Sequence, residues 1–563
     1  MPVISALHKF SLLLLLLNAA YASAQYYPAK NDCLNFTSVC FEFPWMKQAR
    51  SYEILLVNET TGKSAQYYCS ANKLIVDGLA FGTSYNWTVS GKDSRNKTIS
   101  THQPIHFSIG THPHLSSRYV RFREVTNNHL KRGSELLIFD YAQLVLNHDL
   151  ETVWFLPSLP FMNNGSGLRD LKLTADGTFL AIIDSNAYEL SRTGKVLWKA
   201  PNDGTVSGGT GEDYHHDLQK LASGNYMVLG NEHIQRKLPG MADSVRFQIG
   251  TIIEYTPDGT VAWEWHAKDF FTDELLMLRR KADGSYETAT HMNAFTVSGS
   301  SIYAGFRDAS WILKIDKTSK KVTELYGGPD SGLSNHYAKG LFAFQHDVNI
   351  LRNGAIAVVN NDSIKSPNIF SSLVVFSQGE GTFEKGEERF RFYFNYDSLT
   401  TGKSTKLGNM SELRNGNYLV NMGAINRVFE VTPKGELVWD VLIEQSDTLK
   451  NAWRAYPQYR VAAATSLYPN EFAVKWEASP EKDGSVRGQL VVFNVGPEPN
   501  SYTVFSERKD GLRTIAGTIP LLHTGQSGST FVDIPDGVLN GETRLLVKAN
   551  GKSTCETITI RKR

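Results

Sequence analysis

The fold is decided by a short stretch of sequence, Gly224-Asn225-Tyr226-Met227-Val228-Leu229, in which a turn glycine directly precedes an apolar strand. Outward along the chain, the same arrangement recurs at four other glycines: Gly177, Gly299, Gly354 and Gly416. In three units a second hairpin follows, with Trp four residues after its glycine, at Gly194, Gly259 and Gly435. Two successive hairpins make a four-stranded antiparallel sheet, and no helical periodicity separates the units. The centre of the chain is therefore expected to hold five such sheets in series.

A series of this kind predicts a β-propeller, because each sheet can cover its apolar faces only against its neighbours. A sixth sheet is expected to be shared between the two ends of the region. Asp149–Trp154 is typical of an outer hairpin without an inner one, and Tyr459–Ala463 of an inner strand without an outer one. Joining them would remove the exposed sheet edges. We expect an all-β chain with a six-bladed β-propeller over residues 116–468.

Both flanks of this region have the pattern of short strands broken by turn residues. Residues 26–115 contain Tyr52–Val57 and Leu79–Val89, and they resemble a fibronectin type III β-sandwich with Tyr85 and Trp87 in its core. Residues 469–563 are expected to form a second, smaller β-sandwich, whose role the sequence leaves open.

The composition is that of an ordinary globular protein. Hydrophobic residues make up 41% of the 563 residues and charged residues 20%, and the formal net charge is +1. No global field draws such a chain to nucleic acid or to an acidic membrane surface. Any anion that the protein handles must therefore be held by a local arrangement of donors.

The first 24 residues have the pattern of a secretory signal peptide. Lys9 precedes the leucine run Leu12–Leu17, and Ala22-Ser23-Ala24 supplies a small-residue cleavage site. The run is too short to span a bilayer, and no later stretch is a candidate membrane span. The mature chain is expected to begin near Gln25 and to be secreted or periplasmic.

Four cysteines, Cys33, Cys40, Cys69 and Cys555, fit an oxidising compartment and allow three pairings. We expect a structural disulfide in the terminal domains, with Cys33 and Cys40 as a candidate local pair. The sequons would be glycan sites only in a eukaryote, and the sequence leaves the kingdom open: Asn35, Asn58, Asn86, Asn96, Asn164, Asn361 and Asn409.

Three histidines share one position in the repeat. His216, His291 and His346 each lie eight residues before a hairpin glycine, where the other two units have Arg169 and Gly408. This position starts the innermost strand of each sheet, so the side chains are expected to converge at one end of the central axis. One such histidine would be explained equally well by packing. Three together favour a functional site, because a dry core would not collect groups that are costly to bury unpaired.

The same hairpin logic adds an arginine. Arg307 lies eight residues after Gly299, so the returning strand brings it back to the end where His291 lies. An ion pair with Asp308 at the rim is the alternative explanation. Beside three histidines, however, a fixed fork of donors suits a tetrahedral oxyanion. The sequence thus predicts an anion site.

Four motifs now carry a resemblance: His215-His216-Asp217, Thr290-His291-Met292-Asn293, the strand that ends in Arg307, and Phe344-Gln345-His346-Asp347. In this order they resemble the aryl-sulfate sulfotransferases, secreted enzymes that move a sulfuryl group between phenols without the nucleotide donor PAPS. The likeness covers about residues 160–465. It implies that His346 is transiently sulfated and that His216, His291 and Arg307 support it. The extra C-terminal domain departs from the bacterial pattern and leaves anchoring and assembly open.

The chemistry fits these residue types. A double displacement needs a nucleophile that is neutral near pH 7 and forms a labile adduct, and an imidazole satisfies both conditions. Arg307 would stabilise charge on the peripheral oxygens, while His216 and His291 would donate hydrogen bonds and exchange the phenolic proton.

Further candidates are assigned lesser roles. Asn293 is a candidate sulfate or ring-orienting contact, although satisfying loop backbone explains it as well, and Arg169 is a further anion contact. Asp347 is expected to orient the loop rather than the ring. His215 should face the opposite side and is left out of the site.

The expected partners are a small aryl sulfate donor and a phenolic acceptor, with no cofactor and no metal; a homodimer is one assembly that stays open. Two alternatives remain. Three histidines can bind zinc as in a metal hydrolase, and calcium-centred lactonase propellers also exist, although the positive charge of Arg307 disfavours a divalent cation. The chain could also be a secreted adhesive propeller that binds sulfated ligands without turnover.

Overall fold

The structure is a computed structural model of the whole chain, and it describes residues 26–111, 119–163, 166–278, 284–285, 288–362, 370–397, 402–447, 449–480, 486–508, 511–534 and 542–561. The predicted all-β class is confirmed, since 51% of the chain is strand. In the described ranges the helical segments are α1 (Asp273–Met277) and the 3₁₀ turn η2 (Ala267–Asp269). The predicted signal peptide lies outside the described residues.

Five sheets follow one another through the centre of the chain, each with four antiparallel strands in sequence order from its innermost strand outward, and the third adds a short parallel strand at its outer edge. Their turn glycines Gly177, Gly224, Gly299, Gly354 and Gly416 all have positive φ, between 58° and 96°. The strands of the first three sheets are β13 (Leu168–Leu173), β14 (Phe179–Ile183), β15 (Asn186–Leu190) and β16 (Val196–Lys199); β17 (Leu218–Lys220), β18 (Tyr226–Arg236), β19 (Val245–Tyr255) and β20 (Val261–His266); β21 (Met292–Ser298), β22 (Ser301–Phe306), β23 (Trp311–Asp316), β24 (Val322–Tyr326) and β25 (His336–Tyr337).

The fourth and fifth sheets continue the series, and the fifth carries two extra strands. Their strands are β26 (His346–Ile350), β27 (Ile356–Asn360), β28 (Ser372–Phe376) and β29 (Glu388–Tyr393); β30 (Asn409–Glu412), β31 (Tyr418–Asn421), β32 (Arg427–Val431) and β33 (Leu437–Asp447), with β34 (Ala452–Ala455) and β9 (Val120–Asn127) paired to β33.

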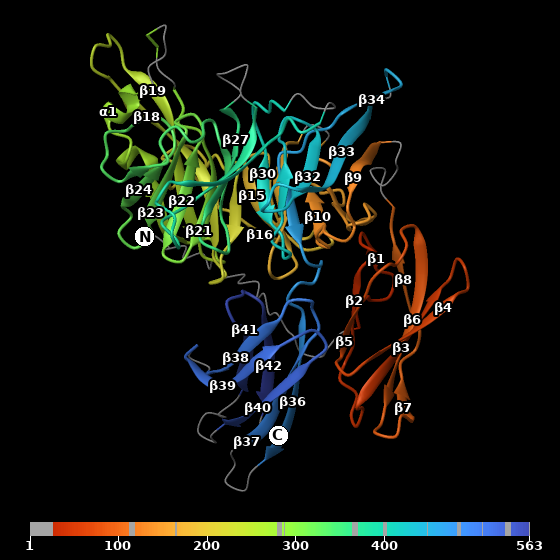
Figure 1. The fold of residues 1–563 in the computed structure, drawn as a ribbon. Helices are drawn as coiled ribbons and strands as arrows, with labels where there is room; N and C mark the ends of the chain where they lie inside the picture. Colours follow the sequence, from red (N-terminus) through yellow and green to blue (C-terminus); the bar gives the residue numbers. More distant parts are fainter. Residues whose placement is uncertain are drawn as a thin grey trace, which may run out of the picture.

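A sixth sheet joins the two ends of this region. Its order is β12 (Thr152–Phe155), β11 (Leu144–Leu146), β10 (Leu136–Phe139) and β35 (Val461–Ala464), so its innermost strand comes from the far end of the chain segment. The inner strand β35 contacts both β30 of the fifth sheet and β13 of the first. The six sheets therefore contact one another in cyclic order, and Figure 1 shows them together in the upper part of the molecule.

Aromatic side chains fill the spaces between neighbouring sheets. Trp154 of the sixth sheet stacks on Phe179 of the first with ring centroids 4.0 Å apart. Trp198, the residue four after Gly194, stacks on Tyr226 of the second sheet at 3.8 Å. Each pair buries an apolar face that neither sheet could cover alone, which is why a repeated sheet specifies its own neighbours.

The N-terminal strands form two sheets, seen in red and orange in Figure 1. Alternate side chains of β3 and β6 are buried, and Tyr85 and Trp87 lie in the core as predicted. The strands are β1 (Cys33–Leu34), β8 (Ile105–Ile109), β6 (Thr83–Lys92), β3 (Ser51–Asn58), β4 (Ser64–Cys69) and β7 (Thr98–Thr101) in one sheet, and β2 (Val39–Glu42) and β5 (Lys73–Val76) in the other.

The C-terminal strands, in blue in Figure 1, also form two sheets around one apolar core. They are β36 (Phe472–Pro480), β37 (Val486–Asn494) and β40 (Ser527–Ile534) in one sheet, and β39 (Arg513–Leu522), β38 (Asn500–Glu507), β41 (Glu542–Ala549) and β42 (Cys555–Arg561) in the other.

The candidate disulfide between Cys33 and Cys40 is not formed, and all four thiols are free. The reason is the strand pairing: Cys33 pairs with Ser108 in one sheet, whereas Cys40 pairs with Ile75 in the other. Proximity in sequence therefore does not bring the two sulfur atoms into bonding position.

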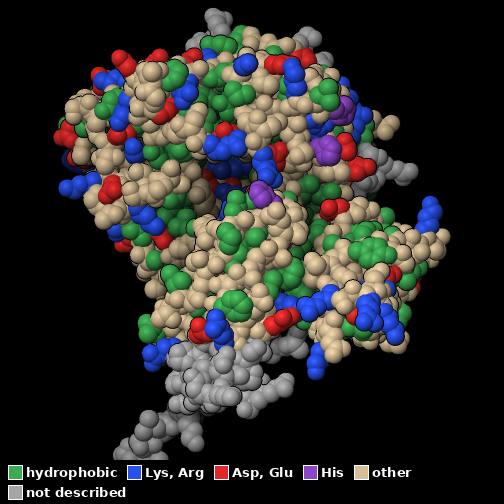
Figure 2. Space-filling model, turned by 60° about the horizontal axis from the view of Figure 1, so that its bottom comes forward, with side chains coloured by type: hydrophobic (Ala, Val, Ile, Leu, Met, Phe, Trp, Pro, Cys, Tyr) green, Lys and Arg blue, Asp and Glu red, His purple; other side chains and the backbone are tan. Residues whose placement is uncertain are grey.

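The surface in Figure 2 has basic and acidic side chains interspersed, and a hollow near its centre contains side chains of both signs. This mixture agrees with the formal net charge of +1. A helix with the length and apolarity of a membrane span is absent from the described ranges.

Candidate active site

The five register positions, Arg169, His216, His291, His346 and Gly408, lie at the start of the innermost strands of five successive sheets. The backbone bends there into the left-handed region, with φ of 63° at His216 and 53° at His291. Strand pairing is also irregular just after Arg169, His291 and His346. Such bends and bulges re-aim side chains relative to the sheet, and they recur at functional sites.

The structure brings His216 and His291 into direct contact. Their Nε2 atoms are 3.3 Å apart, and their ring centroids are separated by 5.1 Å. His215, which the alternation of side chains along a strand excluded, also belongs to this cluster, because its Nδ1 lies 2.6 Å from Nδ1 of His216. The exclusion was wrong because the left-handed bend at His216 interrupts the alternation.

Burial, the main cause, and neighbouring charge favour the neutral form of His215 and His216. Burial lowers the pKa of His215 to about 4. Burial, followed by the charges of His215, His291, His346 and Arg169, lowers the pKa of His216 well below its ordinary value. A neutral imidazole can accept a proton, as a general base requires.

His346 is buried, with only 4% of its surface exposed. Its Nε2 accepts a hydrogen bond from the backbone N–H of Leu407 at 3.1 Å, and its Nδ1 lies 2.9 Å from Nδ2 of Asn361. Burial lowers the pKa of His346 well below its ordinary value, and Arg307, His291 and Arg460 add to the effect. The ring is therefore both held in place and kept unprotonated.

Arg307 follows β22, and its backbone N–H donates to the carbonyl oxygen of His291 at 2.9 Å, so the two residues share one end of the hairpin. The guanidinium pairs with Asp308 at 2.5 Å, as the alternative explanation had it, and donates to the carbonyl oxygen of Thr405 at 3.2 Å. Its Nε is buried and makes no hydrogen bond within the described structure. Asp308 also lies 3.5 Å from Nδ1 of His291, so it links the arginine to the histidine pair.

A cavity of about 410 Å³ opens beside the histidine pair, and its lining includes Arg169, His215, His216 and His291. This volume suits one small molecule. Arg169 is exposed, with its guanidinium 5.9 Å from the ring of Tyr459. A larger cavity, of about 1090 Å³, lies between N-terminal and C-terminal strands and contains none of the predicted site residues.

Neither Asn293 nor the register position Gly408 contributes a side chain to the cavity. Asn293 is buried and donates to the carbonyl oxygen of Gln345 at 3.0 Å, so it links the third sheet to the fourth and does not line the cavity. Gly408 has a φ of 103°, and a Cβ there would lie 3.0 Å from Val359. The fifth sheet therefore contributes no side chain at this position.

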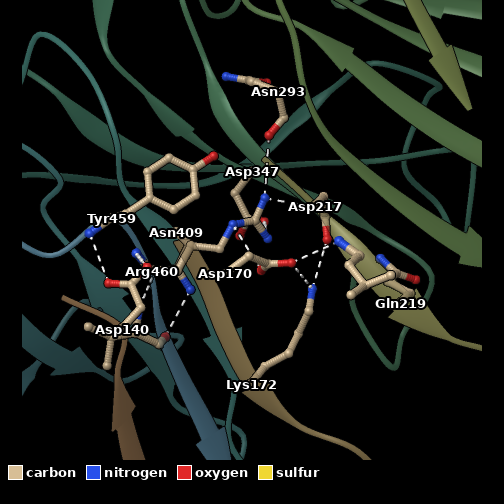
Figure 3. A network of polar contacts seen from close by, with 12 residues as sticks. Asp140, Asp170, Lys172, Asp217, Gln219, Asn293, Asp347, Asn409, Tyr459 and Arg460 are labelled. Atoms are coloured by element: carbon tan, nitrogen blue, oxygen red, sulfur yellow. Dashed lines mark hydrogen bonds and ion pairs between the residues drawn. The ribbon is translucent and has the colours of Figure 1, made fainter. Parts of the chain in front are cut away.

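A buried charged network, which the sequence did not predict, lies directly behind the register positions. Asp170 follows Arg169, Asp217 follows His216 and Asp347 follows His346, and Figure 3 shows these carboxylates around the side chains of Lys172 and Arg460. Lys172 is 2.8 Å from Asp217 and 2.9 Å from Asp170. The signal in the sequence was the acidic residue at the next position in three of the five units.

These carboxylates also connect neighbouring sheets. Asp170 accepts from the N–H of Leu218 at 2.8 Å, Asp217 from that of Phe295 at 3.1 Å and Asp347 from that of Met410 at 2.9 Å. Asp347 thus contacts the adjacent strand β30, whereas the sequence had predicted that it orients the loop. Burial raises the pKa of Asp347 and raises that of Asp170 to about 6, whereas Arg460 and Lys172 outweigh burial and lower the pKa of Asp217.

The described residues include no group of three or more His, Cys, Asp or Glu side chains with the arrangement of a metal site.

Asn361 is a further functional candidate, because its side chain contacts the ring of His346. The sequence identifies it only as a sequon.

Two α-2-macroglobulins are among the solved structures to which the chain is similar. An α-2-macroglobulin of Escherichia coli activated by porcine elastase has 8% identity and a TM-score of 0.14 over 96% of this chain and 44% of that one. A mutant α-2-macroglobulin of Salmonella has 9% identity and a TM-score of 0.13 over 96% of this chain and 34% of that one. The chain thus spans less than half the length of either, and scores this low establish no common fold.

No curated protein matches the sequence. The family model for arylsulfotransferases (ASST) matches residues 137–428, which is more than half of the chain and contains His216, His291, Arg307 and His346. The chain therefore belongs to the arylsulfotransferase family.

Proposed function

We propose that the protein is a PAPS-independent aryl-sulfate sulfotransferase that moves a sulfuryl group from an aryl sulfate ester to a phenolic acceptor through a sulfohistidine at His346. Membership of the family supports arylsulfotransferase activity in general. The observation that carries the proposal is the meeting of His216 and His291 from two sheets, 3.3 Å apart, beside the buried His346 and the cationic Arg307.

In the first half-reaction, Nε2 of His346 gives up its hydrogen bond from the N–H of Leu407, and its lone pair attacks the sulfur of the donor. A nitrogen–sulfur bond forms while the bond from sulfur to the phenolic oxygen breaks, and the departing phenolate takes the proton of an imidazolium in the pair of His216 and His291, which leaves that histidine neutral. In the second half-reaction that histidine accepts the proton of the incoming phenol, whose oxygen attacks sulfur and returns the electron pair to His346. Ping-pong kinetics follow from this order.

The charges of the site suit this reaction. The transferring group carries negative charge on its peripheral oxygens, and Arg307 supplies a permanent positive charge with one buried N–H not engaged by the described residues. Burial keeps His346 unprotonated and hence nucleophilic. The contacts of its ring with Asn361 and Leu407 restrict its rotation, which lowers the entropic cost of attack.

The surrounding architecture is part of the proposal. Cyclic contact of the six sheets supports a six-bladed β-propeller over residues 116–468, and the paired sheets on either side support β-sandwiches over residues 26–115 and 469–563, the first of the fibronectin III type. Residues 1–24 have the pattern of a signal peptide, which supports a secreted or periplasmic location.

The test is turnover of para-nitrophenyl sulfate with a phenol acceptor. Wild-type protein should release no more than one equivalent of nitrophenol without acceptor and should turn over continuously only when acceptor is present, and His346→Ala should lose more than about a thousandfold in rate. A radiolabelled sulfuryl group from the donor should remain on the wild-type protein and not on the variant. His336→Ala is the matched control, because His336 is buried at 6% exposure but binds the carbonyl oxygen of Gly327 away from the site.

Other outcomes would replace the proposal. Acceptor-independent release would indicate a sulfatase, and loss of activity on chelation would indicate a metal hydrolase. Binding of the aryl sulfate without release of phenol would indicate an adhesive protein.

A further inference from the structure

We propose that Arg460 is a positioning residue of the sulfuryl-transfer site, which ties the strands bearing Arg169, His216 and His346 to one another and places a fixed positive charge behind His346. This inference rests on the function proposed above. It concerns a residue outside the family match, on the segment that closes the ring of sheets.

Arg460 immediately precedes β35, the inner strand of the sixth sheet, and its side chain is only 12% exposed. The guanidinium reaches three carboxylates on three different sheets: Nη2 is 3.1 Å from Asp217, Nε is 3.5 Å from Asp170 and Nη1 is 3.6 Å from Asp347. Nη2 also lies 3.4 Å from the carbonyl oxygen of Asn293 on the third sheet. Figure 3 shows the side chain in the middle of these groups.

Each of these three aspartates is the next residue in the chain after a register position. A displacement of Asp217 therefore moves His216, and a displacement of Asp347 moves His346. Asp140 in turn fixes the backbone of Arg460 by accepting its N–H at 2.8 Å. A planar guanidinium with its donors in a fixed fork can hold three carboxylates at once, which a lysine ammonium cannot do with the same geometry.

Lys172 does not duplicate this role. Its ammonium group forms ion pairs with Asp170 and Asp217, while among the described residues the ion pair to Asp347 comes from Arg460. Asp347 is the carboxylate next to the proposed nucleophile, so the contact specific to Arg460 is the one closest to the reacting atom.

The charge of Arg460 also acts on His346. The charged and titratable groups around this ring are Arg307, His291, His216 and Arg460, together with Asp347, the next residue in the chain. Burial is the main cause of the lowered pKa of His346, and the arginines and His291 lower it further. Loss of the Arg460 charge raises this pKa, so at a given pH below about 6.5 more of the histidine is protonated and unable to attack.

The test compares Arg460→Met with Arg460→Lys in the full chain, using para-nitrophenyl sulfate over a range of pH. The Met variant should lose about tenfold to a hundredfold in kcat with a smaller change in KM, because ring placement is disturbed. The acid limb of its kcat/KM profile should move to higher pH. The Lys variant keeps the charge but not the fork, so it should restore the wild-type acid limb while kcat stays reduced.

Arg427 provides the matched control. It is fully buried and pairs with Asp440 of the fifth sheet and with Asp397, which follows the last strand of the fourth. Arg427→Met should destabilise the protein but leave the acid limb in place. If Arg460→Met does not fold, Asp347→Asn tests the same link with the opposite sign: removal of the neighbouring negative charge should move the acid limb to lower pH.

An unchanged acid limb and kcat in folded Arg460→Met, or in Asp347→Asn, would overturn the inference. The titration of His346 followed by NMR of its ring measures the same pKa change without turnover. Absence of sulfuryl transfer in the wild type would therefore refute the proposed function, whereas an unmoved titration in the Arg460 variants would refute the role of Arg460.

Discussion

At the scale of single residues, Asn361 illustrates how one contact changes the meaning of a side chain. Asn361-Asp362-Ser363 is a sequon, yet the Asn361 side chain is fully buried. Its Nδ2 donates to the carbonyl oxygen of Leu407 at 3.1 Å and lies 2.9 Å from Nδ1 of His346. A side chain in this position cannot carry a glycan in the folded protein, and its contacts are those of a residue that orients the imidazole.

Asn361→Ala should therefore reduce kcat by about tenfold to a hundredfold with little change in KM, because the His346 ring gains rotational freedom. Steady-state kinetics with an aryl sulfate donor and a phenol measure this effect. Asn360→Ala is the control: the neighbouring side chain is also buried, but it accepts from the N–H of Ala343 at 3.0 Å and does not contact the ring. Equal losses of kcat in both variants would mean that Asn361 acts only through stability.

At the scale of strands and sheets, the fifth and sixth sheets are joined by a side chain that hydrogen-bonds to a strand backbone as a neighbouring strand would. Asn409, at the start of β30, accepts from the N–H of Val461 at 2.8 Å and donates to the carbonyl oxygen of the same residue at 2.9 Å. The side chain therefore makes both hydrogen bonds of a ladder partner. It joins the fifth sheet to β35, the strand that completes the sixth.

Asn409→Leu should lower the free energy of unfolding by about 2–4 kcal/mol, because the substitution removes two buried hydrogen bonds from the backbone of Val461. Urea denaturation followed by tryptophan fluorescence measures the change. A loss below about 0.5 kcal/mol would show that the backbone of Val461 finds other partners, and that Asn409 does not hold the ring closed.

At the scale of the whole molecule, Lys73 links the N-terminal and C-terminal strands. It lies on β5, and its ammonium group is 2.7 Å from Glu471 and 2.7 Å from Glu556 on β42, with Glu42 at 3.8 Å. Its side chain is only 9% exposed. Several carboxylates around one buried ammonium make its removal costly, because each would be left without its charge partner.

Lys73→Met should destabilise the contact between these strands by about 3–5 kcal/mol, while sulfuryl transfer at the distant site continues. Limited proteolysis and thermal unfolding, measured beside the transfer assay, test this separation. Lys131→Met is the control, because the pair of Lys131 and Glu436 is about half exposed and should contribute no more than about 1 kcal/mol. If a folded Lys73→Met variant lost transfer activity, the prediction would be wrong, because the C-terminal strands would then be coupled to catalysis.

The sequence by itself determined the all-β class, the family and which residues begin the inner strands. Hairpin glycines mark each sheet at a constant offset, so counting eight residues back finds His216, His291 and His346 without coordinates. The count succeeds because a hairpin relates positions on its two strands through the local geometry of the turn alone.

The tertiary structure alone decided which groups complete the site. Arg460 reaches the network from the far end of the segment, and Leu407 contacts His346 from the connection between the fourth and fifth sheets, so no local period relates them to it. Asn361 follows the second strand of the sheet that holds His346, and only the folded hairpin shows that its side chain meets the ring. His215 joined the cluster through a left-handed bend that breaks the alternation of a strand. The spacing of residues along a strand determines which face of its own sheet a side chain lies on. Contacts between sheets depend instead on how all six sheets pack against one another.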